Sequence, residues 1–211
     1  MKFARTLGAY QADTLLRAFP DDVFDGYPPI GELLIESTFH NVTAELEAVA
    51  GVLLFGQYVG HDVATDRAIS RQAAEAITDY FPNRKVSVRN IGDVPIAAWP
   101  SAGSVAVRPG ILDRQSFCED DGYDHTLVLL DSNVYNGAVA STSHSFISTT
   151  AKVFSEVNDT PFWKVAVAVG VLASADLHAR TIVLPSREYG KVDVSEGEML
   201  LRSVNLNLVV D

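Results

Sequence analysis

An alternating run at residues 163–171 is the feature that most constrains what this chain can fold into. Successive side chains of a β-strand point to opposite faces, so strict alternation predicts a strand with two different faces. One face here is bulky and β-branched, which favours a strand, and the other is small enough for a second layer to approach it closely. The positions between the bulky residues are Lys164, Ala166, Ala168 and Gly170.

Comparable patterns fill the rest of the C-terminal half. Short apolar or alternating runs at 127–130, 145–154, 178–184 and 200–210 indicate further strands separated by turns. Parallel strands would need crossover helices, for which these runs leave no room. We therefore predict an antiparallel, jelly-roll-like β-sandwich over residues 119–211, built for packing rather than for catalysis.

The N-terminal half, residues 1–118, contains the clearest helical pattern of the chain. At about 65–81 the apolar residues fall on one face at a spacing of three to four, and Pro82 follows the end. Residues 6–19 could form another short helix. The proline-rich stretch 20–31 is either a docking arm or an ordinary surface loop.

Short strands are expected in the remainder of this half. Residues 31–39 and 85–107 carry β-like runs. Residues 43–59 fit either a helix or strands turning on glycine, and we favour strands from Gly51 onward. The N-terminal half is therefore predicted as an arm plus a small β-barrel-like region with one or two helices, which makes the fold class mainly β.

Composition narrows the classes of function. The chain has 27 acidic and 16 basic residues, a formal net charge of -11, which repels phosphate backbones and anionic lipid surfaces. We therefore expect neither nucleic-acid nor membrane binding. A hydrophobic content of 47% allows a sizeable core, and a single cysteine excludes an intrachain disulfide. No apolar run has the length of a signal peptide or a membrane span, so we expect a soluble protein made in a reducing cytoplasm.

Cys118 is the one candidate nucleophile that has possible bases elsewhere in the chain, His125 and His144. The acidic residues 119–121 follow it directly, and neighbouring carboxylates raise the pKa of a thiol. We therefore expect a lone, unreactive thiol. Ser145 is not in a GxSxG turn, and the glycines of GVLLFGQYVG do not fit a phosphate-binding loop.

Two acidic loops could offer oxygen ligands to a cation. Asp120, Asp121 and Asp124 surround Gly122, which suits Ca²⁺, but their spacing is not that of a twelve-residue calcium loop. A solvated loop is the expectation, and cation binding by residues 119–124 is left open. The same holds for the second loop, which contains Asp21, Asp22 and Asp25.

The histidines lie far apart and lack metal-ligand spacing. They are His40, His61, His125, His144 and His178. His178 and Arg180 share a face of their predicted strand, which favours a contact with a partner. We thus predict no catalytic residue, no cofactor and no metal ligand.

Two stretches are similar to structural proteins of tailed bacteriophages. The strings GVLLFGQYVGHD, KVSVRNIGDVPIAAW and SVAVRPG resemble strands of capsid cement or decoration proteins. The C-terminal string FWKVAVAVGVLASADLHARTIVLPSREYGKVDVSEGEMLLRSVNLNLVVD resembles the terminal β-domain of many phage structural proteins. This resemblance implies a virion protein, made in the host cytoplasm, that binds the major capsid protein or other virion proteins and forms a homo-oligomer.

Other functions stay open beside a capsid decoration protein. Within the particle, the chain could serve as a neck, tail-terminator or fibre-attachment protein. In a different class, a carbohydrate- or ligand-binding β-sandwich would use exposed aromatic residues such as Tyr27, Trp99 or Tyr189 to stack on a sugar. A hydrolase using Cys118 or a histidine ranks last, because no partner groups stand at a recognisable spacing.

Overall fold

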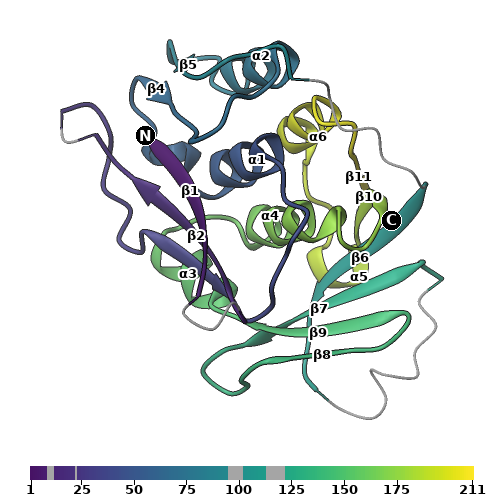
Figure 1. The fold of residues 1–211 in the computed structure, drawn as a ribbon. Coiled ribbons are helices and arrows are strands. Elements are labelled where there is room, and N and C mark those ends of the chain that lie inside the picture. The colour runs from purple at the N-terminus through teal and green to yellow at the C-terminus, as the bar shows by residue number, and fades with distance from the viewer. Residues whose placement is uncertain (9–11, 22, 95–101, 113–121) are drawn as a thin grey trace.

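A mixed β-sheet runs through the molecule in the computed structural model (Figure 1). The structure describes residues 1–8, 12–21, 23–94, 102–112 and 122–211. In this part of the chain the sheet has the order β1-β2-β3-β9-β7-β6-β10-β11, β8 also pairs with β9, and β4 and β5 form a separate pair. The strands are β1 (Lys2–Leu7), β2 (Thr14–Phe19), β3 (Glu32–Ile35), β4 (Asp62–Val63), β5 (Ser87–Val88), β6 (Gly103–Pro109), β7 (His125–Asp131), β8 (Ala138–Ala140), β9 (His144–Thr149), β10 (Ala179–Leu184) and β11 (Asn207–Val210).

One half of the sheet is parallel and the other half is antiparallel. Strands β9, β7, β6, β10 and β11 all run in the same direction, whereas β1, β2 and β3 form an antiparallel meander. The two halves meet where Ile35 of β3 pairs with Thr149 of β9. Strands from the beginning and the end of the chain therefore share one sheet. The domain boundary predicted between residues 118 and 119 lies outside the described residues.

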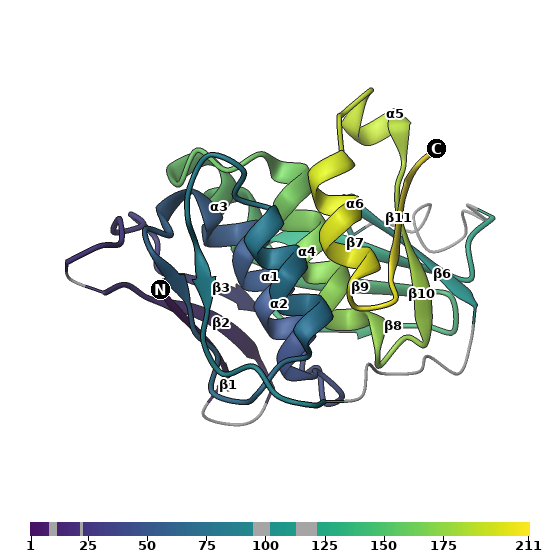
Figure 2. The same ribbon diagram turned by 90° about the horizontal axis from the view of Figure 1, so that it is seen from above.

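The main helices cover one face of this sheet. Helices α1 and α4 pack on each other against the strands, and α2 and α6 lie above them (Figure 2). Because α1 and α4 are enclosed between the sheet and the outer helices, they are apolar around most of their surface, with Glu45 and Glu47 in α1 and Lys164 in α4 as the charged exceptions. The helices are α1 (Ala44–Phe55), followed by the 3-10 turn η1 (Gly56–Tyr58), α2 (Arg71–Asp79), α3 (Ala151–Val157), α4 (Phe162–Ser174), α5 (Ser186–Tyr189) and α6 (Ser195–Arg202).

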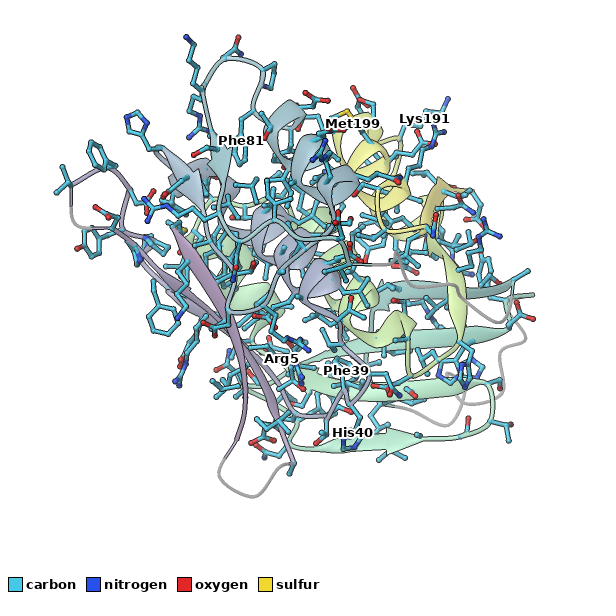
Figure 3. The ribbon with its side chains drawn as sticks, turned by 45° about the horizontal axis from the view of Figure 1, so that its top comes forward. Arg5, Phe39, His40, Phe81, Lys191 and Met199 are labelled. Carbon is cyan, nitrogen blue, oxygen red and sulfur yellow. The ribbon has the colours of Figure 1, made fainter. Side chains whose placement is uncertain are left out.

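Helix α1 is buried along its whole length, including two acidic residues of its first turn. The Thr43 side chain caps the helix by accepting a hydrogen bond from the Leu46 amide at 3.3 Å. Glu47 accepts a hydrogen bond from the backbone of Arg5, while burial raises the pKa of its carboxyl. The Arg5 guanidinium donates to the carbonyl of Phe39 at 2.8 Å, close to the start of the helix (Figure 3). These contacts tie β1 to the loop that leads into α1.

The antiparallel sandwich predicted for residues 119–211 is wrong in the described residues. Residues 163–171 form helix α4, and the Glu196–Gly197 turn and the residues after it belong to α6. The last strand is shortened to β11, whereas β10 confirms the strand at 178–184. Alternation was misleading because a helix buried on every side needs no polar face, so small and large residues can follow one another in any order. Helices α3 and α4 supply the crossover from β9 to β10, and α5 and α6 supply the one from β10 to β11, which allows these strands to be parallel.

The N-terminal predictions had mixed outcomes. The helix expected at about 65–81 is present as α2, which begins after its cap Ser70 and is therefore shorter. The helix considered for residues 6–19 is not found in the described part of that range, where Thr6 and Leu7 belong to β1 and residues 14–19 form β2. The stretch from Gly51, for which strands were favoured, lies in α1, and β3 confirms a shorter strand within residues 31–39. No described helix reaches the length and apolarity needed to cross a membrane.

The proline-rich stretch 20–31 is held to the body of the protein at three points. Asp25 accepts a hydrogen bond from the Gly60 amide at 2.8 Å and pairs with the Met1 amine. The Gly26 amide donates to Tyr58 at 2.8 Å. Near its end, the backbone of Ile30 exchanges two hydrogen bonds with the side chain of Asn158, each 2.9 Å long. This stretch is therefore an anchored loop rather than a free docking arm.

Candidate ligand-binding site

A cavity of about 620 Å³ lies where three parallel strands end. Strands β6, β7 and β9 finish at Pro109, Asp131 and Thr149, and all three residues line the cavity. Open α/β sheets bind their ligands beyond the carboxyl ends of the strands, because loops of varied sequence converge there on a rigid frame. Pockets that hold small molecules usually enclose about 300–1,000 Å³. The position and the size of this cavity are thus those of a ligand site.

The floor and walls of the cavity are mostly apolar. Leu129 and Leu130 project from the end of β7 to opposite faces of the sheet, and both are buried. Ala151, at the start of α3, adds a small buried surface. Phe162 closes one side at the start of α4, where its ring stacks on Tyr189 with the centroids 6.2 Å apart. These side chains are held by the core, so the cavity is formed without a ligand.

The rim carries the charged groups. Asp131 forms an ion pair with Lys152, with 3.5 Å between carboxylate oxygen and ammonium nitrogen. The amide of Asn133 donates to the same carboxylate at 2.9 Å and, together with the charge of Lys152, lowers the pKa of Asp131. Glu156 adds a second carboxylate from α3. With two acids and one base, the rim has a net charge of about -1 at neutral pH.

Other polar groups of the cavity are committed to the fold. The Thr149 hydroxyl donates to the carbonyl of Leu34 at 2.7 Å, and the Ser155 hydroxyl donates to the carbonyl of Thr160 at 2.7 Å. The hydroxyl of Tyr135 and the carboxylate of Glu156 make no hydrogen bond or ion pair with described residues. A ligand would therefore meet an apolar interior and a few polar groups at one end, the usual arrangement of a small-molecule site.

Two exposed residues stand at the entrance: Ile111 and Val134 line the cavity but keep 59% and 67% of their surface exposed. Ile111 follows β6, and Val134 belongs to the loop between β7 and β8. Their side chains can be replaced without disturbing the core, because they pack against little else.

The structure also brings His125 and Ser145 together. The His125 Nε2 atom lies 2.9 Å from the Ser145 hydroxyl, a separation that fits a base and a nucleophile. Burial lowers the pKa of His125, while a hydrogen bond to the backbone of Thr142 acts in the opposite direction. Both side chains are more than nine-tenths buried, and neither lines any of the described cavities. We therefore interpret the pair as a structural contact between β7 and β9.

His144, the other histidine considered as a base, lies on the opposite face of the sheet from His125. His144 pairs with Thr126, whereas Ser145 pairs with Leu127, so His125 and His144 point to opposite faces of the sheet. Cys118 lies outside the described residues. Within the described ranges no three side chains of His, Cys, Asp or Glu are grouped to hold a metal ion.

The acidic loops have specific contacts where they are described. Asp124 accepts two hydrogen bonds from Ser104, from its amide and its hydroxyl, and these lower the pKa of the Asp124 carboxyl. Asp120 and Asp121 fall outside the described residues, as does Asp22. Asp21 accepts a hydrogen bond from Val23, and Asp25 is occupied by the contacts given above. The described carboxylates therefore stabilise turns.

The two described aromatic residues considered for sugar stacking lie on different elements of the fold. Tyr27 is exposed on the anchored loop, Tyr189 stacks on Phe162 behind the cavity, and Trp99 lies outside the described residues. His178 and Arg180 are exposed at the start of β10, away from the cavity lining.

Sequence reasoning missed the cavity because it did not recognise the strands as parallel. A signal was present: each buried run ends in turn or polar residues, at Pro109–Gly110, at Asp131 and at Thr149. In a parallel sheet such residues meet at the same edge. In comparisons with known proteins, no family model, no curated protein and no solved structure matches this chain.

Proposed function

We propose that the protein binds a small molecule in the cavity at the carboxyl ends of β6, β7 and β9. The observation that carries this proposal is the preformed apolar cavity at that edge, with its charged groups confined to the rim. The apolar interior favours a ligand with a hydrocarbon or aromatic body. The two rim carboxylates, in a chain of net charge -11, favour a positively charged group over an anion at the exposed end.

Fluorescence titration with proflavine, a flat cationic aromatic amine, tests this proposal. We expect saturable binding of one dye per chain, and weaker binding of the anionic dye anilinonaphthalene sulfonate. Val134→Lys should weaken proflavine binding by about tenfold, because it places a repelling charge and a polar stem at the entrance. Val157→Lys is the matched control, because Val157 is also exposed, at 49%, but does not line the cavity.

A second variant tests the role of the rim charge. Glu156→Gln should lower the affinity for proflavine by a factor of about two to five and leave that for the anionic dye unchanged or raised, since an exposed ion pair contributes less than about 1 kcal/mol. Equal proflavine affinities in Val134→Lys and Val157→Lys, or no saturable binding to the wild-type protein, would refute the cavity as the site.

A structural role in a phage particle remains a prediction. The resemblance that suggests this role includes fewer strands than expected, because parts of the strings that resemble phage strands lie in helices α1, α4 and α6. The segment around β8, which is exposed and without charge, would suit assembly onto the major capsid protein or other virion proteins. Co-purification with intact particles tests this second proposal independently of ligand binding.

A further inference from the structure

In the described part of the chain, strand β8 leaves one edge of the sheet open. Among described strands it pairs only with β9, in the register Val139 opposite Phe146 (Figure 1, lower margin of the sheet). Gly137 and Ser141 bond with Ser148 and His144 at either end. In an antiparallel pair, every second residue directs its amide and carbonyl toward the partner strand. The amides and carbonyls of Ala138 and Ala140 therefore point away from β9.

The residues of this edge are exposed and carry no charge. Ala138, Val139 and Ala140 are all exposed, and Val139 keeps 47% of its surface accessible. From residue 132 to residue 151 the chain has no Asp, Glu, Lys or Arg. Natural edge strands are usually protected from pairing by charged side chains, proline or bulges. This edge has no charged side chain and no proline, and its register with β9 is regular.

We propose that β8 pairs with β8 of a second copy of this chain, in an antiparallel arrangement about a two-fold axis. Val139 would then face its own counterpart, and Ala138 would face Ala140 of the other copy. The amides and carbonyls that point away from β9 would exchange hydrogen bonds in both directions, as a self-complementary contact requires.

The charge of the protein favours a second copy as the occupant. Two chains of net charge -11 repel each other, so their approach is least unfavourable along residues 132–151, which have no formally charged side chain. The Glu36 carboxylate, which accepts from the Gly137 amide, lies at one end of this edge. The edge sequence Ala138-Val139-Ala140 reads the same in both directions, so two copies placed antiparallel complement each other. The contact area stays well below the roughly 1,000 Å² of a stable interface. The dimer is therefore weak, with a dissociation constant of about 10 µM to 1 mM.

Sedimentation equilibrium of the full chain between about 10 µM and 1 mM tests the proposal. We expect a monomer–dimer equilibrium that strengthens as salt rises from about 20 to 300 mM, because screening weakens the repulsion between like-charged copies. Val139→Lys should weaken the dimer at least tenfold, since two lysines would face each other. Val157→Lys, with the same change of charge on α3, should dimerise like the wild-type protein.

Ala140→Pro tests the backbone contact without adding charge. The amide of Ala140 points away from β9, so proline removes a donor to the second copy and spares the pairing with β9. We expect weaker dimerisation with an unchanged circular dichroism spectrum. A wild-type protein that stays monomeric, or dimers that persist unchanged in both Val139→Lys and Ala140→Pro, would overturn the proposal. Since Val139 does not line the cavity, Val139→Lys should bind proflavine like the wild-type protein, which separates this test from that of ligand binding.

Discussion

At the scale of single residues, Asn158 joins three parts of the fold. Its side chain donates to the carbonyl of Ile30 and accepts from the amide of Ile30, at 2.9 Å each. Its own carbonyl accepts hydrogen bonds from Gln57 and Tyr58 in η1, directly after α1. Asn158 is 1% exposed, so no water can replace a lost partner without rearrangement. It therefore fixes the loop before β3, the end of α1 and the end of α3 relative to one another.

Asn158→Asp should destabilise the protein by about 3 kcal/mol. The substitution keeps the acceptor but removes the donor, and it turns a buried carboxyl toward the carbonyl of Ile30. Urea unfolding measures the free energy, with Asn83→Asp as a control at an exposed turn. Similar free energies of unfolding for the two variants would contradict this account of Asn158.

His125 predicts a pH dependence of stability. Burial lowers the pKa of His125 in the folded protein below the value of about 6.5 that it has when unfolded. The folded state thus favours the neutral ring, and its stabilisation is complete above about pH 6.5 and is lost as the pH falls from there toward the lowered pKa. A single such group changes the free energy of unfolding by at most about 1.4 kcal/mol per pH unit.

Unfolding of the wild-type protein and of His125→Gln between pH 7.5 and about pH 5 measures this contribution. We expect the wild-type stability to fall more steeply below pH 6.5, because glutamine does not titrate. If the free energies of unfolding of the two proteins changed in parallel with pH, His125 would have the same pKa in the folded and unfolded states, which would contradict the prediction.

At the scale of elements, α1 sits so close to β1 that a glycine is needed between them. A Cβ atom added to Gly51 would lie 2.5 Å from two ring atoms of Phe3. Phe3 is fully buried and stacks on Phe55, with the ring centroids 6.1 Å apart, so its ring has little freedom to move. The close approach of helix and strand thus depends on this position.

Gly51→Ala should destabilise the protein by about 1–3 kcal/mol, although alanine is the better helix former by about 1 kcal/mol. Gly31→Ala is the matched control, because an added Cβ there meets no atom closer than 3.9 Å. Thermal unfolding followed by circular dichroism compares the two. A higher melting temperature for Gly51→Ala would mean that α1 can shift away from β1.

The elements show which parts of a sequence can be interpreted without a structure. Helix α2 was predictable because it is half exposed, so its polar face reveals the helical period. Strand β10 was predictable because its buried run ends at Pro185. Helices α1 and α4 were not, since a wholly buried element shows no contrast between faces. Because residues 163–171 were predicted as a strand, no crossover helix was expected and the strands were predicted to be antiparallel. The edge at which the cavity lies could then not be predicted either.

At the scale of the whole molecule, a curved mixed sheet holds two buried helices on one face (Figures 1 and 2). The two surfaces for which we propose binding lie apart from each other. The cavity lies at the carboxyl edge of the parallel strands, and the open edge of β8 lies beside β9. The loop from β7 to β8 joins them, because Val134 and Tyr135 line the cavity and lead into β8. Ligand binding and self-association nevertheless use different side chains and can be changed one at a time.

The most direct test of the central claim is to map a bound ligand by nuclear magnetic resonance. Proflavine titrated into uniformly ¹⁵N-labelled protein should shift the amide signals of residues 110–111, 129–131 and 149–152, and few others. These residues surround the cavity at the ends of β6, β7 and β9. Shifts centred instead on the depression beside α2, lined by Arg71 and Asp79, or no saturable shifts at all, would contradict the account.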